Sequence, residues 1–251
     1  MTSVVIIGFG NVGQHLFQAF EEVSGASVVQ VYSRKEQLDL DDTPITNSLQ
    51  DLTEADLYIL AVPDDIISDF SEQLPFSNRL VVHTSGSVSM EMLSEENRKG
   101  IFYPLQTFSK DHEVNFKEIP ICCEAVYEED LELIMSLGEL ISDKVVQIDS
   151  EKRTRLHLAA VFVNNFTNHL YHLSDSYLKK NDIDFDLLKP LIKETAIKVQ
   201  TLSPFEAQTG PAKRKDRKTI NKHLELMEDR EYRKLYRSLT KSISKTHGKK
   251  L

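Results

Sequence analysis

Apolar and polar positions follow two different patterns along the chain, and the change comes near residue 149. Before it, short runs rich in Val, Ile, Leu and Tyr end at Gly, Pro, Ser or Asp, which is typical of buried strands. We expect strands at residues 3–7, 26–33, 56–64, 80–84, 100–108, 120–126 and 144–148. Helical periodicity between several of these runs, clearest at 128–141, predicts an α/β fold with a doubly wound sheet.

Shorter elements are expected between these strands. Pro63 suits the first position of a helix, because its missing N–H is no loss there. Ser87 or Ser89 is expected to cap a helix that runs towards Asn97. Residues 37–48 are polar and are expected to form a loop.

Beyond residue 149 the spacing of apolar residues is helical throughout. One long helix is expected to start at a Ser150 cap and to run to about residue 180. Further helices are expected at 186–202, at 216–228 with Asp216 as the cap, and at 229–244, with a loop at 203–215. We therefore predict an α/β domain, residues 1–149, followed by an all-α domain, residues 150–251.

The composition is that of a soluble globular protein, since 40% of the 251 residues are hydrophobic and 27% are charged. No apolar run approaches the ~20 residues that span a bilayer, and the chain enters a strand without a signal sequence. A cytoplasmic location is therefore expected. The only two cysteines, Cys122 and Cys123, are adjacent, a spacing that disfavours a bridge and predicts free thiols on a strand.

The net charge of −9 conceals an asymmetry. Residues 213–251 contain 14 Lys and Arg against 5 Asp and Glu, which leaves 16 against 34 in residues 1–212. Such a basic segment is either a solvated helical face or a site for an anionic ligand or partner. Lys213 and Arg214, directly before the helix that Asp216 caps, are candidates for holding a substrate anion.

The first strand leads into a glycine motif, Gly8-x-Gly10-x-x-Gly13, and a helical pattern follows at once. In this strand–turn–helix context the motif is the dinucleotide fingerprint. Its first glycine permits the tight turn, the second lets the backbone approach a pyrophosphate, and the third lets the helix pack closely on the strand. Gly8, Gly10, Val12 and Gly13 are expected to line the pyrophosphate, and Phe9 and Asn11 are further candidates for binding the cofactor.

The residues after the second strand bear on which cofactor binds. A fingerprint that prefers NAD has Asp or Glu there to hold the ribose hydroxyls. This chain has Ser33, Arg34 and Lys35 instead, which suit a 2′-phosphate and favour NADP. The alternative is that Arg34 and Lys35 are ordinary surface charges. Val62 and Pro63, at the end of the third strand, are expected near the nicotinamide ribose.

Candidate catalytic residues are expected at the end of one strand and on the long helix. His83 could act as a general acid at the end of its strand, although such a histidine is more often hydrogen-bonded there, and no third residue completes a nucleophilic triad with Ser85. On the helix, His157, Asn164 and Asn168 share a face, which either enters a cleft between the domains or is a plain polar strip. Asn165 and His172 lie at the edge of that face. No carboxylate or cysteine set completes a metal site with His169 and His172, so none is expected.

The whole pattern resembles one bacterial family, whose members join a Rossmann-like domain to a helical C-terminal domain of unknown function and are described as NADP-dependent oxidoreductases. The motifs that carry the resemblance are 8–13, Ala61-Val62-Pro63-Asp64, His83-Thr84-Ser85-Gly86-Ser87, Tyr103-Pro104-Leu105-Gln106-Thr107-Phe108, 160–166, and Thr209-Gly210-Pro211 with Arg214 and Asp216. More distantly the layout is similar to pyrroline-5-carboxylate reductases, deazaflavin-dependent NADP reductases and β-hydroxyacid dehydrogenases.

The resemblance implies an active site between the two domains and a homodimer formed through the C-terminal helices. His83, Ser85, Gln106 and Asn165 are the residues expected at the reacting end. β-Hydroxyacid dehydrogenases carry a catalytic lysine one helical turn before an asparagine, where this chain has Ala160 and Val161. Alcohol oxidation by that route is therefore disfavoured, and an imine or another acceptor is favoured. Lys215 stands where relatives tend to have glycine.

The sequence thus predicts an NADP-dependent oxidoreductase that moves hydride between nicotinamide and a small anionic substrate in the interdomain cleft. An alternative is a non-catalytic NADP-binding sensor or regulatory module, which the missing lysine favours. A third reading, a nucleic-acid surface on the basic C-terminal segment, lacks interleaved aromatic residues and a binding motif. No nucleic-acid or membrane partner is therefore expected.

Overall fold

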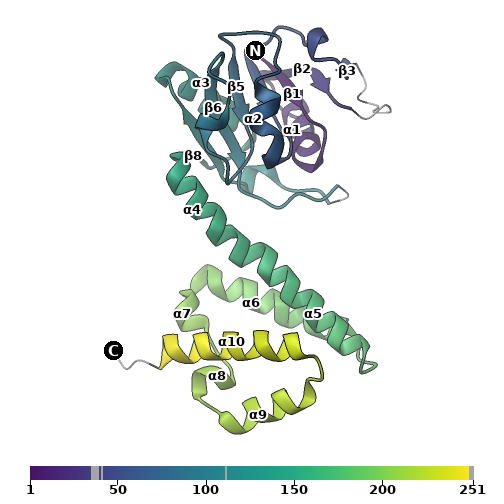
Figure 1. Cartoon of the computed structure of the whole chain (residues 1–251), viewed down its shortest axis with the longest axis vertical. Coiled ribbons are helices and arrows are strands. Elements are labelled where there is room, and N and C mark those ends of the chain that lie inside the picture. Colours follow the sequence, from purple (N-terminus) through teal and green to yellow (C-terminus); the bar gives the residue numbers. More distant parts are fainter. Residues whose placement is uncertain (35–39, 41, 111, 249–251) are drawn as a thin grey trace. The chain divides into compact units, whose positions relative to one another are not determined.

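The computed structural model describes residues 1–34, 40, 42–110 and 112–248. The chain divides into two compact units, Met1–Leu170 and Tyr171–Leu251 (Figure 1). The first unit contains an eight-stranded sheet and the second is helical. Both parts of the predicted fold class, an α/β domain followed by an all-α domain, are confirmed.

The sheet of the first unit has the strand order β3-β2-β1-β4-β5-β6-β7-β8. All neighbouring strands are parallel except β6 and β7, which are antiparallel. The strands are β1 (Thr2–Ile7), β2 (Ala26–Tyr32), β3 (Ile45–Thr46), β4 (Leu57–Leu60), β5 (Leu80–His83), β6 (Arg98–Pro104), β7 (Ile121–Ala125) and β8 (Val145–Gln147). Seven of them lie where the sequence predicts a strand.

Alternate residues of the strands enter two apolar layers, one on each face of the sheet. Val4 and Ile6 pack with α1 (Asn11–Glu21) and α3 (Glu128–Ile141) on one face. Val5 and Ile7 pack on the other face with residues that include Ile67 of α2 (Ile67–Ser71). Because β1 is buried on both faces and lies between β2 and β4, its carboxyl end is held in the centre of the sheet.

Four local expectations in the first unit are corrected. The segment expected to be a polar loop contains the edge strand β3, which two backbone pairings hold against β2. Pro63 is the N-cap of a 3₁₀ turn, η2 (Asp64–Ile66), rather than a first helical residue. The helix expected towards Asn97 is only the 3₁₀ turn η3 (Met90–Met92), capped by Ser89. Asp149, rather than Ser150, caps the long helix by accepting the N–H of Lys152 at 2.8 Å.

The long helix runs through α4 (Ser150–Val161), a π-helical turn η5 (Phe162–Phe166) and α5 (Thr167–Lys179). Its predicted extent is close to the observed one. The division between the two compact units falls inside this helix, between residues 170 and 171. Ser150 anchors the start of α4 to the first unit, since its hydroxyl accepts the N–H of Met90 at 3.1 Å and donates to Glu124 at 2.6 Å.

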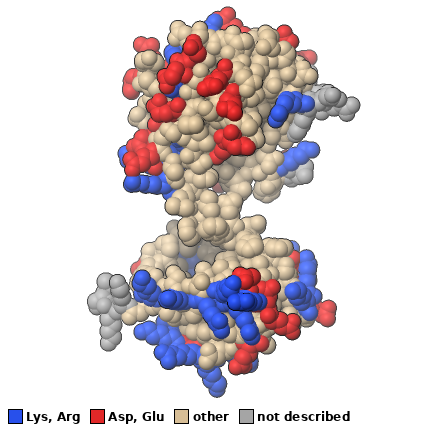
Figure 2. Space-filling view, in the orientation of Figure 1, with Lys and Arg blue, Asp and Glu red and all other residues tan. Residues whose placement is uncertain are grey.

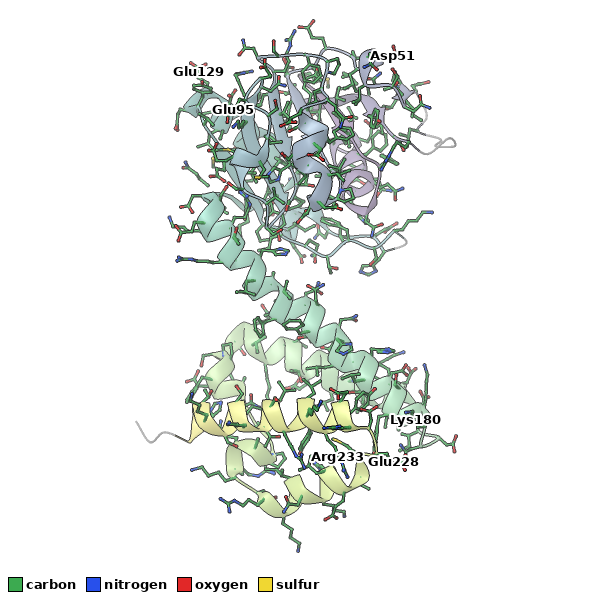
Figure 3. All side chains as sticks on the ribbon, viewed as in Figure 1. Asp51, Glu95, Glu129, Lys180, Glu228 and Arg233 are labelled. Atoms are coloured by element: carbon green, nitrogen blue, oxygen red, sulfur yellow. The ribbon has the colours of Figure 1, made fainter. Side chains whose placement is uncertain are left out.

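The second unit consists of helices. They are η6 (Phe185–Leu188), α6 (Lys189–Thr201), α7 (Pro204–Ala207), α8 (Pro211–Arg214), α9 (Arg217–Leu226) and α10 (Arg230–His247), and α5 extends into this unit. Side chains cap the N-termini of η6, α7, α9 and α10. Asp216 accepts the N–H of Thr219 at 3.0 Å, as its predicted role as a cap requires. Arg233, labelled in Figure 3, donates its Nε–H to the carbonyl oxygen of Leu224 at 3.0 Å and joins α10 to α9.

Each unit has its own surface character. In the view of Figure 2, acidic side chains predominate on the first unit and basic ones on the second. The basic side chains come chiefly from α9 and α10. Among the described helices, none is both long and apolar enough to cross a membrane.

The remaining short 3₁₀ turns of the first unit are η1 (Leu49–Asp51) and η4 (Phe116–Glu118). Cys122 and Cys123 are free, buried residues of β7, as predicted.

Candidate active site

The first and third glycines of the β1–α1 turn are required by the backbone itself. Gly8 has a φ of +100°, and a Cβ there would collide with the carbonyl oxygen of Ala61. A Cβ on Gly13 would collide with the carbonyl oxygen of Gly8. These two glycines therefore allow the turn and the close packing of α1 on β1.

Gly10 is different, because a Cβ there would have no heavy atom within 4 Å. It is the exposed N-cap of α1, without a side-chain cap, and the first turn of the helix has no acidic residue. The first helical hydrogen bond runs from the N–H of Gln14 to Gly10 O at 3.0 Å, so the preceding N–H groups lack helical partners. An uncapped helix end beside open space fits the pyrophosphate of a dinucleotide.

The other predicted cofactor residues lie around this turn or at the neighbouring strand end. Phe9 is buried and packs edge-on against Phe17, with ring centroids 5.7 Å apart, so its part is in packing. Asn11 is exposed and donates from Nδ2 to the carbonyl oxygen of Phe108 at 3.0 Å. Val62 lies against Gly8, and Pro63 is exposed just after it.

The residues predicted to hold the adenosine phosphate follow β2. Ser33 is buried, and its N–H donates to the carbonyl oxygen of Thr46 in β3 at 2.9 Å. Arg34 is exposed. Lys35 lies outside the described residues. The unexpected strand β3 thus fixes the backbone from which Arg34 projects.

A cavity of about 650 Å³ lies beside the glycine turn. That volume is within the usual range for a small-molecule site. Its wall is contributed by the start of α1, the end of β6 with the loop after it, α4 and the π-helical turn. The lining residues are Asn11, Val12, Tyr103, Leu105, Gln106, Thr107, Phe108, Leu156, His157, Ala159, Ala160, Val161, Val163, Asn164 and Asn165.

Two of the four residues predicted at the reacting end, Gln106 and Asn165, line this cavity. Asn165 belongs to the π-helical turn, together with Asn164. Asn168, which the sequence placed on one face with His157 and Asn164, does not line the cavity. A π turn takes an extra residue and rotates all that follows, so the expected spacing is interrupted there.

The other two, His83 and Ser85, lie outside the cavity lining and serve the turn after β5. His83 is fully buried, accepts the Ser85 N–H at Nδ1 (3.1 Å), and has Nε2 3.4 Å from the carbonyl oxygen of Ser89. Burial, with a smaller effect of the Arg153 charge, lowers the pKa of His83 to about 4. The Ser85 hydroxyl accepts the N–H groups of Ser87 and Val88, at 3.1 and 3.0 Å. This geometry favours a structural role for both side chains.

Tyr103 and His157 meet in the cavity wall, although they are far apart in the sequence. Tyr103 Oη lies 3.2 Å from His157 Nδ1, and the two rings are edge-on. Burial raises the pKa of Tyr103 to about 12. Gly86 makes room for the pair, since a Cβ there would lie 2.5 Å from His157 Nδ1 and 2.8 Å from Tyr103 Oη.

The helical spacing predicts a polar face that includes His157, and Tyr103 belongs to a separate motif, so the contact between them is not predictable from either pattern. No local signal joins β6 to α4.

A buried ion pair fixes the segment of α4 that carries His157. Arg153, one helical turn earlier, has no exposed surface, donates to Glu124 Oε2 at 2.7 Å, and also donates to the carbonyl oxygen of Val88. Its Nε is buried without a hydrogen-bond partner among the described residues. A buried guanidinium group is costly unless it keeps its hydrogen-bond partners. Movement of α4 would separate Arg153 from Glu124, so the ion pair holds α4 in one position.

The residues predicted to hold a substrate anion belong to the second unit. Lys213 donates from Nζ to the carbonyl oxygen of Gln208 at 2.7 Å, and Arg214 is exposed at the end of α8. The helix ends at Lys215, which has a φ of +58°. Among the described residues, including His169 and His172, no group of three or more potential ligands could hold a metal ion.

Comparisons with known proteins agree with this arrangement. A Rossmann-like domain model matches residues 1–107, and a model for a domain of unknown function, DUF2520, matches residues 119–243. The structure is similar to that of a provisionally assigned NADP oxidoreductase from Bacteroides fragilis, with 39% identity and a TM-score of 0.87 over 97% of this chain and 98% of the other.

Two more distant structures share the fold. A protein from Thermotoga maritima has 22% identity and a TM-score of 0.72, with 98% of each chain covered. The pyrroline carboxylate reductase of Plasmodium falciparum, solved with NADP bound, has 14% identity and a TM-score of 0.60, with 98% of this chain and 97% of that chain covered. A search of curated proteins found no match.

Proposed function

Because the chain belongs to the family that joins a Rossmann-like domain to a DUF2520 domain, we propose that it is an NADP-dependent oxidoreductase acting on a small substrate. The similarity to a provisionally assigned NADP oxidoreductase over nearly the whole of both chains supports the general class. The local geometry of the first unit supports the same conclusion independently.

The observation that carries the proposal is that Asn11 and Val12 belong both to the glycine turn and to the wall of the cavity. A dinucleotide whose pyrophosphate rests on the start of α1 would therefore have its nicotinamide end beside this cavity. When bound, NADP supplies the hydride-carrying carbon of the reaction. Gly10 leaves the space for the pyrophosphate, and Val62 and Pro63 lie at the neighbouring strand end.

Selectivity for NADP is assigned to Arg34, whose exposed guanidinium follows the buried Ser33 at the end of β2. A forked contact with the 2′-phosphate is charge-assisted and is absent from NAD. We expect Arg34→Gln to weaken NADPH binding about tenfold to one-hundredfold and to leave NADH binding unchanged. Equal losses for the two nucleotides would contradict the assignment.

The reaction is tested by following the absorbance of NADPH with the full-length protein and a panel of 2-oxo acids, cyclic imines, and uncharged aldehydes and ketones. Loss of absorbance with any of them supports an oxidoreductase. Binding of NADPH without turnover across the panel supports the alternative, a nucleotide sensor. Absence of NADPH binding contradicts both.

The anionic substrate expected from Lys213 and Arg214 stays a prediction. If it is correct, Arg214→Gln raises KM for 2-oxo acids and leaves KM for uncharged ketones unchanged. The same loss for both classes would contradict it.

We also propose that the protein forms a homodimer through its helical unit. Large apolar side chains on the described helices of this unit are exposed, among them Leu187 (72%), Leu191 (62%) and Leu226 (57%), and such exposure supports a protein interface. Analytical ultracentrifugation should find a dimer, and Leu191→Lys should shift it towards monomer. A monomeric wild-type protein at micromolar concentration would contradict this proposal.

A further inference from the structure

We propose that Tyr103 and His157 are the proton-delivering pair of the cavity, and that the group which reacts there is an uncharged carbonyl or imine. This inference rests on the proposed oxidoreductase function and deepens it by naming the acid and the chemical class of the reacting group. It is carried by the chemistry of the cavity wall, by the contact between the two side chains, and by their rigid support.

The cavity wall offers only two titratable side chains among its described residues, Tyr103 and His157. The rest are apolar groups, the Thr107 hydroxyl, and the amides of asparagine and glutamine residues. An ionised reacting group would find no opposite formal charge on an Asp, Glu, Lys or Arg side chain of this wall, and burying an unpaired charge is costly. A neutral C=O or C=N group, by contrast, needs only a hydrogen-bond donor, which a phenol supplies.

The contact between the two side chains is suited to passing a proton. Tyr103 Oη and His157 Nδ1 are 3.2 Å apart, within reach of a hydrogen bond. His157 Nε2 has no hydrogen-bond partner among the described residues, and the side chain is only half-buried, so this nitrogen can exchange protons with solvent. Because burial raises the pKa of Tyr103 to about 12, the phenol keeps its proton at neutral pH and can give it to a stronger base.

The positions of the Tyr103 and His157 side chains are fixed by neighbouring elements of the first unit. Tyr103 is at the end of a central strand, and Arg153 anchors α4 through Glu124 one turn before His157. Gly86 lies against both rings and cannot carry a side chain without displacing them. Such support is what a positioned acid requires, since it must stay within about 0.5 Å of its working place.

The proton balance of a reduction is then complete. Bound NADPH would supply a hydride to the substrate carbon, and the π electron pair of the C=O bond would then move to oxygen. Tyr103 donates its Oη proton to that oxygen, which becomes a hydroxyl. His157 gives its Nδ1 proton to the Tyr103 oxygen while its Nε2 takes a proton from a solvent water, which leaves as hydroxide. The net change is one hydride and one proton added to the C=O bond, with NADPH oxidised to NADP⁺.

The test uses two probes of nearly the same shape, cyclohexanone and methylenecyclohexane, added to the full-length protein with saturating NADP⁺, so that no turnover takes place. Tyrosine is labelled with ¹³C at the ζ carbon, and the Tyr103 resonance is identified by its absence in Tyr103→Phe. Cyclohexanone should shift this resonance and methylenecyclohexane should not. Tyr103→Phe should weaken cyclohexanone binding about fivefold, the value of one neutral hydrogen bond, and leave methylenecyclohexane binding unchanged.

The matched control is Tyr127→Phe, because Tyr127 is exposed and lies outside the cavity lining. It should change neither affinity. With any compound that the protein reduces, Tyr103→Phe should lower kcat about one-hundredfold or more, and His157→Asn should also lower kcat.

NADP⁺ binding with no response of Tyr103 to cyclohexanone, or an equal loss of both probes in Tyr103→Phe, would overturn the proton-delivering pair. Absence of NADP⁺ binding would instead overturn the proposed function. The two failures are therefore distinguishable.

Discussion

Replacing Gly10 by alanine should abolish much of the nucleotide binding and leave the fold intact. A Cβ at Gly10 has no protein atom within 4 Å, and the φ of −83° is one that alanine adopts freely. The free energy of unfolding should therefore stay within about 0.5 kcal/mol of the wild-type value. The new methyl group would, however, stand where a pyrophosphate approaches the N–H groups of α1. Loss of one or two charge-assisted hydrogen bonds, about 1.5–3 kcal/mol, weakens NADPH binding roughly tenfold to one-hundredfold.

Gly8→Ala and Gly13→Ala are the matched variants, because there the Cβ would meet the backbone of Ala61 or of Gly8. The clash, with left-handed backbone strain at Gly8, should destabilise each by about 2 kcal/mol or more. Isothermal titration calorimetry measures the affinity for NADPH, and urea unfolding followed by circular dichroism measures the stability. Wild-type affinity in Gly10→Ala would refute the placement of the pyrophosphate, and a stability loss as large as that of Gly13→Ala would refute the open space.

Three further predictions concern stability. Because the pKa of His83 is lowered to about 4, the unfolded chain binds a proton at this residue more readily than the folded one between pH 6.5 and 4, and the free energy of unfolding decreases as the pH is lowered. Between pH 7 and pH 5 this loss is about 2 kcal/mol. His83→Asn should remove that part of the pH dependence, measured by urea unfolding. Lys215→Gly should raise the free energy of unfolding of the second unit by about 0.5–1 kcal/mol in the same assay, because glycine adopts the φ of +58° without strain; an unchanged midpoint would contradict this. Arg153→Met should lower the free energy of unfolding by about 3 kcal/mol, because it leaves the Glu124 carboxylate without its ion-pair partner. Adding Glu124→Gln should recover part of this loss. Strictly additive changes in a double-mutant cycle would contradict the buried pair.

Local patterns predict most of the fold. Apolar runs locate seven of the eight strands, and the periodicity of residues 128–141 matches α3 residue for residue. The missed strand β3 has only two residues and depends on pairing with β2, so its own sequence carries little signal. The antiparallel direction of β7 is also a property of the assembled sheet.

The site was predictable only where its chemistry is local. The glycine turn has a fixed spacing within one strand–turn–helix unit, and the structure gives its glycines three distinct environments. The pairing of Tyr103 with His157 needs β6, the turn at Gly86 and α4 to be assembled first. His83 looked reactive at a strand end because sequence alone does not reveal that it is fully buried.

The central claim is that a phosphorylated dinucleotide binds at the start of α1 and beyond β2. Calorimetric titration of NADPH and of NADH into the full-length protein tests it most directly. We predict saturable heat with NADPH at micromolar concentration and an affinity for NADH at least about tenfold weaker. No heat with either nucleotide would contradict the claim.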